Sequence, residues 1–365
     1  MHEVREPVFQ TIIDDIINKI ARKELKPHDY LGTQIDLAKS YKTSETTSRK
    51  ALERLVQQGL IYRIKKKGTF ISENASEMHS SSIKSSLIDQ ICFVVNFFPF
   101  YNILENRFFL DVWKAVSDAC SALNITLTFI PSIESKMPDN PHAGFIMMLS
   151  PNTDQSEFVR IIDGKRPFVA IHGYFPHLPV PYVIGDNVTG GYLATQHLIS
   201  QGHREIAIVL TGKSMMKLNQ EFSFRYQGYK LAMEQHKYRL NEEHILIIDS
   251  DDEKAGYAAT EKLLSLSNRP TAVFFSSDKK ALGGLYALHA HHIHVPREIS
   301  LIGYDDQYFT GMTKPAITTM NQNAAKIGER AVELLLLHST TKQVLKEEIP
   351  PCLIVRDSVG PGPVY

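Results

Sequence analysis

The sequence predicts an α/β protein that joins an N-terminal winged helix-turn-helix to a two-lobed body with parallel sheets. Three observations lead to this fold class. Helical spacings and then a hairpin pattern fill residues 1–72, and a polar, serine-rich stretch comes next. Beyond it, short apolar runs alternate with amphipathic helical patterns, which is typical of right-handed βαβ units whose sheets are covered on both faces.

The first part of the chain contains the patterns of three helices. Apolar residues recur at helical spacing over residues 9–20 and predict an amphipathic first helix. Thr33 and Asp36 have the spacing of a capping box, which favours the start of a short second helix. A third helix is predicted over residues 46–58, and a β-hairpin follows it.

This order of helix, turn, helix and basic hairpin predicts a DNA-binding module, because it places one helix in a major groove and the hairpin against phosphates. Residues 1–72 carry 14 Lys and Arg against 9 Asp and Glu, whereas the rest of the chain carries 26 against 31. A basic head on an acidic body suits a polyanionic partner for the head. The alternative for Arg49 and Lys50 is a solvated helix face. The candidate DNA contacts are Thr46, Thr47, Arg49, Lys50, Lys65, Lys66, Lys67 and Gly68.

Residues 73–88 are predicted to be a linker, because this polar stretch has too little apolar surface to fold alone. The body, residues 89–365, is longer than one compact core requires, so two similar lobes are expected. Ligands of such sheets bind outside the carboxyl ends of the strands. The predicted strands are residues 91–95, 126–130, 145–149, 168–171, 206–210, 245–248, 272–275 and 299–302. The predicted helices are residues 108–123, 189–200, 225–236, 254–266, 279–290 and 324–338.

Composition and motifs argue against several other classes. Cys92, Cys120 and Cys352 are scattered without metal-like spacing, and no apolar run approaches the ~20 residues of a membrane span. We therefore expect a soluble protein of the reducing cytoplasm, with no membrane partner. The four histidines within residues 289–294 offer only a pair at helical spacing, so no metal site and no cofactor are expected. The sequence has no phosphate-binding glycine loop, nucleophile elbow or zinc-protease motif, so we expect no enzymatic activity.

An ordered set of short motifs runs through the body. These lie at residues 184–187, 190–191, 197–198, 202–204, 225 and 228, 270–274, 278–283, 295–296, 300–306 and 318–319. The set resembles the effector domain of the lactose-repressor family, which is shaped like a periplasmic sugar-binding protein. The resemblance covers roughly residues 90–358 of the chain. The head resembles the winged-helix domain of the GntR family. The pairing resembles the arabinose-type transcriptional repressors of Gram-positive bacteria.

The resemblance implies a set of ligand residues in the body. It nominates Arg225 and Asp278, an aromatic pocket wall at Phe108, and a contact at Asp251, where relatives often place an aromatic side chain. A carboxylate at a strand end can accept from two vicinal hydroxyls, and a guanidinium supplies fixed donors opposite it. An acidic residue at position 251 favours hydroxyl-rich ligands over flat bases. For Asp278, the alternative is that it caps the helix that opens at Lys279.

The head departs from the GntR pattern at three positions. That family commonly has arginine where this chain has Ile35 and Glu45, and glycine where it has Lys66. Because arginine is the usual bidentate reader of guanine, we expect a different operator or a lower intrinsic affinity for DNA.

These observations predict a ligand-responsive transcriptional repressor of carbohydrate-use genes. We expect a homodimer whose heads bind two half-sites of double-stranded operator DNA. A small-molecule effector, a sugar or sugar derivative, would release it. The alternatives are a corepressor-dependent regulator of the same architecture, a sugar-modifying enzyme with a DNA-binding head, and an architectural DNA-binding protein whose body only dimerises.

Overall fold

The computed structural model describes residues 8–21, 24–57, 59–64, 68–73, 88–95, 106–131, 138–148 and 166–363. The chain divides into two compact units, Met1–Leu87 with Ser339–Lys342, and Ile88–His338 with Gln343–Tyr365. Most of the predicted linker, and Lys65, Lys66 and Lys67, lie outside the described residues.

The described residues of the first unit form three helices around a small apolar core: α1 (Val8–Ala21), α2 (Gln34–Ser40) and α3 (Glu45–Gln57). The predicted capping box at the start of α2 is confirmed. The Thr33 hydroxyl accepts the Asp36 amide at 3.2 Å, while the Asp36 carboxylate accepts the Thr33 amide at 2.9 Å.

A three-stranded antiparallel sheet completes this unit, in the order β1 (Tyr30–Gly32), β3 (Gly68–Ile71), β2 (Ile61–Ile64). We call this sheet the wing. Strands β2 and β3 form the predicted hairpin, whereas β1, which is three residues long, was not predicted. Gly68 has a φ of +114°, and a Cβ on it would come within 2.4 Å of the Tyr30 ring, so the wing requires glycine at this position.

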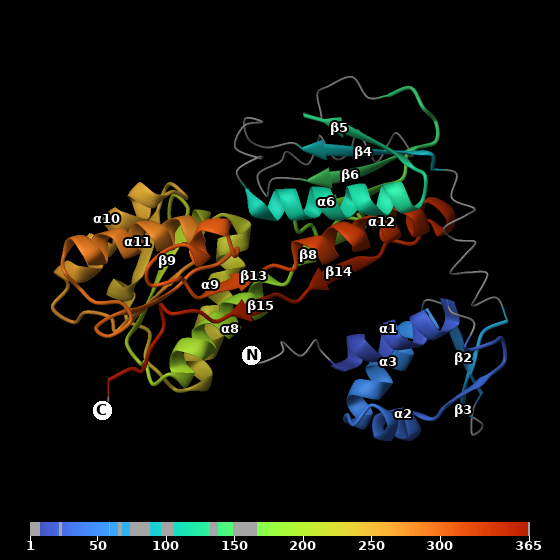
Figure 1. Ribbon diagram of the computed structural model, residues 1–365, viewed down its shortest axis with the longest axis horizontal. Helices are drawn as coiled ribbons and strands as arrows, with labels where there is room; N and C mark the ends of the chain where they lie inside the picture. The colour runs from blue at the N-terminus through green and yellow to red at the C-terminus, as the bar shows by residue number, and fades with distance from the viewer. Residues whose placement is uncertain are drawn as a thin grey trace. The chain divides into compact units, whose positions relative to one another are not determined.

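The second unit begins with a six-stranded parallel sheet in the order β14-β8-β7-β6-β4-β5. Helices α6 (Arg107–Ala122) and α12 (Ala324–Thr341) lie side by side and share one apolar core with this sheet (Figure 1). The strands are β4 (Gln90–Val95), β5 (Thr126–Ile130), β6 (Ala143–Met148), β7 (Phe168–Ile171), β8 (Tyr182–Gly185) and β14 (Lys346–Ile349).

A second parallel sheet has four strands in the order β10-β9-β11-β12 and forms the other lobe. Ile206 and Ile208 of β9 point into the core under α8 and α9, whereas Ala207 and Val209 point into the core under α10 and α11. This alternation covers both faces of the sheet, as predicted. The strands are β9 (Ile206–Thr211), β10 (Ile245–Ile248), β11 (Ala272–Phe275) and β12 (Ser300–Ile302). The helices are α8 (Asn187–Ser200), α9 (Gln220–Gln235), α10 (Glu253–Ser265) and α11 (Asp278–Ala290).

The chain passes between the two lobes three times: from β8 into α8, from β13 (Thr319–Asn321) into α12, and from β14 into β15 (Cys352–Ile354). Strands β13 and β15 pair antiparallel, which ties two of these crossings together. Short 3₁₀ helices lie at Met215–Lys217, Glu242–His244 and Tyr308–Gly311. Within the described ranges, no helix combines the length and the apolar character needed to span a membrane.

Candidate functional site

Four of the predicted DNA contacts of the head lie on α3. Thr46, Arg49 and Lys50 are exposed, while the Thr47 amide donates to the Ser44 hydroxyl at 3.1 Å and so anchors the start of the helix. Arg49 pairs with Glu53 at 3.0 Å, and both side chains are more than half exposed, at 64% and 52%. Exposed pairs of this kind are worth little, so Arg49 can exchange Glu53 for a nucleic-acid acceptor at small cost.

Further contacts surround this helix in the same unit. The Lys50 ammonium lies 4.4 Å from the centroid of the Phe9 ring, so the end of the Lys50 side chain lies against α1. Ile35 on α2 is 45% exposed and Glu45 is exposed in the first turn of α3, so these two of the three departures from the GntR pattern lie on accessible surface. The third, Lys66, lies outside the described residues. Gly68 begins β3 of the wing.

In the body, the segment at residues 276–278 brings three predicted ligand residues together at the carboxyl end of β11. The Arg225 guanidinium donates to the Ser276 carbonyl, and the Ser277 hydroxyl donates to the Asp251 carboxylate at 2.6 Å. Asp278 is the first residue of α11. This is the edge of a parallel sheet at which ligands bind.

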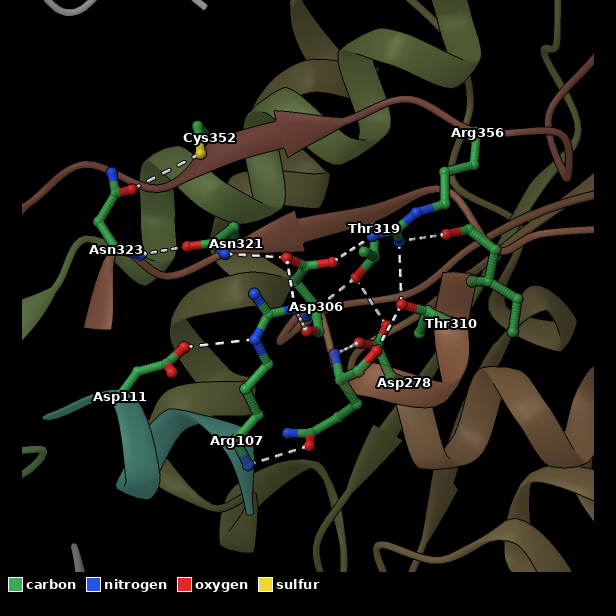
Figure 2. A network of polar contacts seen from close by, with 12 residues as sticks. Arg107, Asp111, Asp278, Asp306, Thr310, Thr319, Asn321, Asn323, Cys352 and Arg356 are labelled. Atoms are coloured by element: carbon green, nitrogen blue, oxygen red, sulfur yellow. Dashed lines mark hydrogen bonds and ion pairs between the residues drawn. The ribbon is translucent and has the colours of Figure 1, made fainter. Parts of the chain in front are cut away.

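Asp278 is fully buried and holds two other segments of its lobe. Its carboxylate accepts the Gln307 amide at 2.7 Å and the Thr319 hydroxyl at 2.6 Å (Figure 2). The residue that caps α11 is Ser277, so the alternative role of Asp278 as the helix cap is wrong. Burial and the neighbouring Asp305 carboxylate raise the pKa of Asp278 well above its ordinary value.

Arg225 on α9 is buried and held from several sides. Its Nε donates to the Asn187 side chain at 2.8 Å, and its guanidinium lies 3.4 Å from the Asp305 carboxylate. The guanidinium lies 3.6 Å from the centroid of the Tyr304 ring. Burial raises the pKa of Asp305 to about 6, although Arg225 acts in the opposite direction.

Asp251 forms an ion pair that was not predicted from the sequence. Its carboxylate is 2.7 Å from the Lys280 ammonium, and the Lys280 side chain has no exposed surface. Lys280 also donates to the Thr211 hydroxyl at 2.7 Å and lies 3.9 Å from the centroid of the Phe222 ring. We call Arg225, Asp251, Asp278, Lys280 and Asp305 the strand-end cluster.

Phe108 lies in the other lobe, near the start of α6. It is 7% exposed within the apolar core, and its ring contacts His172 edge-on at 5.8 Å. Its neighbour Arg107 reaches the lobe of the strand-end cluster: the Arg107 amide donates to the Gln307 side chain at 3.1 Å, and its guanidinium pairs with Asp306 at 3.0 Å. Phe108 therefore lies beside a contact between the lobes.

Asp306 is the centre of that contact and was not nominated from the sequence. Figure 2 shows its carboxylate among Arg107, Asn321 and Arg356. Arg107 belongs to one lobe, Asn321 to a crossing strand, and Arg356 follows β15. The buried carboxylate thus joins α6 of one lobe to two of the segments that cross between the lobes.

The histidine cluster makes other contacts. His291 lies 3.5 Å from Glu261, and His294 lies 2.9 Å from Glu298. In the part of the chain that the structure describes, no three His, Cys, Asp or Glu side chains are grouped to hold a metal ion.

Two family models match the chain. The model of the bacterial regulatory proteins of the gntR family matches residues 9–71, and that of the periplasmic binding protein-like domain matches residues 195–359. The gntR-family model covers the helices and the wing of the head. The periplasmic binding protein-like model includes the four-stranded sheet and all residues of the strand-end cluster.

Curated relatives are bacterial repressors. The chain is 34% identical over 271 residues to the HTH-type transcriptional repressor PurR of Mannheimia succiniciproducens, covering 70% of this chain and 78% of the relative. It is 29% identical over 266 residues to the ribose operon repressor of Haemophilus influenzae, covering 70% and 78%. It is 28% identical over 330 residues to the probable HTH-type transcriptional repressor ExuR of Bacillus subtilis, covering 89% and 97%.

Solved structures share the fold of the body. A complex of the transcriptional regulator CelR with cellobiose matches with a TM-score of 0.64 at 22% identity, covering 89% of this chain and 99% of that one. A regulator of the LacI family from Enterococcus faecium with bound ribose matches with a TM-score of 0.62 at 23% identity, covering 74% and 99%.

Proposed function

Since the chain belongs to the lactose-repressor family of bacterial transcriptional regulators and carries a gntR-type head, we propose that it represses carbohydrate-use genes and leaves its operator when it binds a sugar or sugar derivative. A relative named as the ribose operon repressor, and matched structures with bound cellobiose and bound ribose, support a sugar as the effector. The observation that carries the proposal is the strand-end cluster, in which Arg225, Asp251 and Asp278 meet at the carboxyl end of β11.

In this proposal the head binds DNA through α3 and the wing. Thr46, Thr47, Arg49 and Lys50 contact the major groove, while Lys65, Lys66, Lys67 and Gly68 follow the phosphates. The protein acts as a homodimer through its body, so that two heads occupy the half-sites of a near-palindrome. It acts in the cytoplasm, where its operator is, and by binding rather than by catalysis.

The sugar binds at the strand-end cluster, with Phe108 as an apolar wall from the other lobe. Gln307 couples this site to the lobe contact, because its amide donates to Asp278 while its side chain accepts the Arg107 amide at the start of α6. A ligand that engages Asp278 therefore acts on a residue that also contacts the opposite lobe. A coupling free energy of about 1–3 kcal/mol between sugar binding and the spacing of the heads is enough for regulation.

Selection of DNA from a random duplex pool by the full-length protein tests the DNA-binding half of the proposal. We expect a near-palindromic operator, and we expect Arg49→Ala to lower the preference for it over random DNA. A thermal-shift screen of pentoses, hexoses and disaccharides, with their phosphates, tests the other half. Stabilisation by at least one sugar is expected, and a flat response to all of them contradicts it.

A further inference from the structure

Two lysine or arginine side chains are buried among the described residues, Arg225 and Lys280, and both belong to the strand-end cluster. Each already faces a carboxylate: Arg225 lies 3.4 Å from Asp305, and Lys280 lies 2.7 Å from Asp251. An ammonium has three donors, and those of Lys280 are matched by the Asp251 carboxylate, the Thr211 hydroxyl and the face of the Phe222 ring.

Carboxyl groups outnumber cationic groups in the cluster. Asp251 and Asp305 are paired with cations, but Asp278 accepts from two neutral donors, the Gln307 amide and the Thr319 hydroxyl. The raised pKa values of Asp278 and Asp305, caused by burial and then by neighbouring charges, agree with this crowding of carboxylates.

Accessibility separates the two members of the Asp251–Lys280 pair. The Asp251 side chain is 38% exposed, whereas that of Lys280 is 0% exposed. A ligand can therefore reach the carboxylate but not the ammonium. Desolvation works to raise the pKa of Asp251, but the Lys280 ammonium and the hydrogen bonds from Lys280 and Ser277 outweigh it, so Asp251 is ionised at neutral pH.

We propose that the effector is an uncharged, hydroxyl-rich sugar rather than a sugar acid or sugar phosphate, and that Lys280 positions Asp251 to accept its hydroxyls. This inference rests on the proposed function, because it assigns the chemical class of the ligand at the same site.

The physical reason is the sign of the charge that a ligand meets. Sugar hydroxyls donate to a carboxylate, and such charge-assisted bonds are the strong ones. A ligand carboxylate or phosphate would meet the exposed Asp251 carboxylate, and the buried cations could receive it only by giving up their partners. Like charges brought together in a binding site are strongly unfavourable, so the anionic counterpart of the effector should bind about 100-fold more weakly.

Calorimetric titration of the full-length protein with matched probes tests this. The probes are glucose, glucuronate and glucose 6-phosphate, galactose with its uronate and 6-phosphate, ribose with ribonate and ribose 5-phosphate, and cellobiose. We expect the tightest binder to be uncharged and its anionic counterparts to be about 100-fold weaker at low salt. Their affinity should rise with ionic strength, because salt screens the repulsion, while that of the uncharged sugar should stay constant.

Asp251→Asn tests the assigned residue. The change keeps the shape and removes the accessible charge, so we expect affinity for the uncharged sugar to fall by about 10-fold and the preference over its anionic counterpart to narrow by about 10-fold. Asp118→Asn is the matched control, since Asp118 is an exposed carboxylate on α6 paired with Lys114. In this variant, neither the affinity for the uncharged sugar nor its preference over the anionic counterpart should change. If Asp251→Asn does not fold, the salt dependence of the wild type still decides the question.

The outcomes separate the two levels of the proposal. Tighter binding of a uronate, an aldonate or a phosphate than of the parent sugar overturns the charge inference but leaves a sugar-responsive regulator. An unchanged preference in a folded Asp251→Asn protein overturns the role of Asp251 and Lys280. If no probe binds, sugar recognition itself is wrong, and the inference fails with it.

Discussion

Asp278 shows at the scale of one residue what the sequence can and cannot predict. The alternation of strands and helices predicts its place at a strand end, and the structure has it there. Its complete burial and its two donors could not be predicted, because Gln307 and Thr319 lie 29 and 41 residues further along the chain. Lys280 was missed for the same reason, since its partners Asp251 and Thr211 belong to other strand ends.

The first prediction at this scale concerns Asp278→Asn. An amide keeps one oxygen to accept the Gln307 amide, and the Thr319 hydroxyl can turn to accept instead of donate, so the fold should survive. The amide presents a donor where the carboxyl group presents an acceptor, so a sugar hydroxyl loses its partner. Sugar binding should weaken by about 5- to 150-fold, since an unsatisfied buried polar group costs ~1–3 kcal/mol. Calorimetry with the sugar identified by the screen measures this. Normal sugar affinity in the folded variant would show that Asp278 is not a ligand residue.

The second prediction is a pH dependence that originates at Asp305. Its pKa is about 6 in the folded protein against an ordinary 3.8, so the folded state holds its proton longer than the unfolded state does. The stabilising contribution is present below pH ~4 and is lost as the pH rises through about 6, by up to ~3 kcal/mol. The melting temperature of Asp305→Asn minus that of the wild type should therefore increase as the pH rises from 4 to 7. A constant difference between the two proteins across that range would contradict this.

At the scale of elements, the apolar strands were the predictable ones. The predicted bounds of β5, β7, β10 and β11 agree with the structure residue for residue. The missed strands β1, β13 and β15 are three residues long, and β14 is polar. The apolar strand β8 was missed as well, and it is four residues long. In β14 the buried Glu347 carboxylate pairs with Arg330 of α12 at 2.7 Å, so a tertiary ion pair replaces the apolar pattern that reveals other strands.

The element-scale prediction concerns the tip of the wing. If Lys65, Lys66 and Lys67 follow phosphates, replacing all three with alanine should weaken binding to operator and random DNA alike. The slope of log affinity against log salt should also become shallower by about 0.9 for each phosphate that the variant no longer neutralises. Fluorescence anisotropy over a salt series measures both, with Lys39→Ala on α2 as a control for removal of a charge elsewhere in the head. An unchanged slope would mean that the wing does not contact DNA.

At the scale of the whole molecule, ligand control depends on coupling between the body and the DNA. Gln307 connects the strand-end cluster to the lobe contact through its bonds with Asp278 and Arg107. Asp306 joins Arg107 to the crossing segments (Figure 2). The length of the body predicted two lobes, and the alternation of strands and helices predicted the ligand-binding edge. The sequence did not predict this bridge, because the residues that form it belong to separate lobes and are far apart along the chain.

Operator affinity of the full-length protein, measured with and without a saturating concentration of the identified sugar, tests the central claim most directly. We predict that the sugar lowers the affinity of the wild type by about 5- to 150-fold, as a coupling of ~1–3 kcal/mol requires. At the same sugar concentration, folded Asp278→Asn should stay on its operator. A sugar that binds the wild type and leaves operator affinity unchanged would contradict ligand-controlled repression, and a sugar that raises the affinity would make the effector a corepressor.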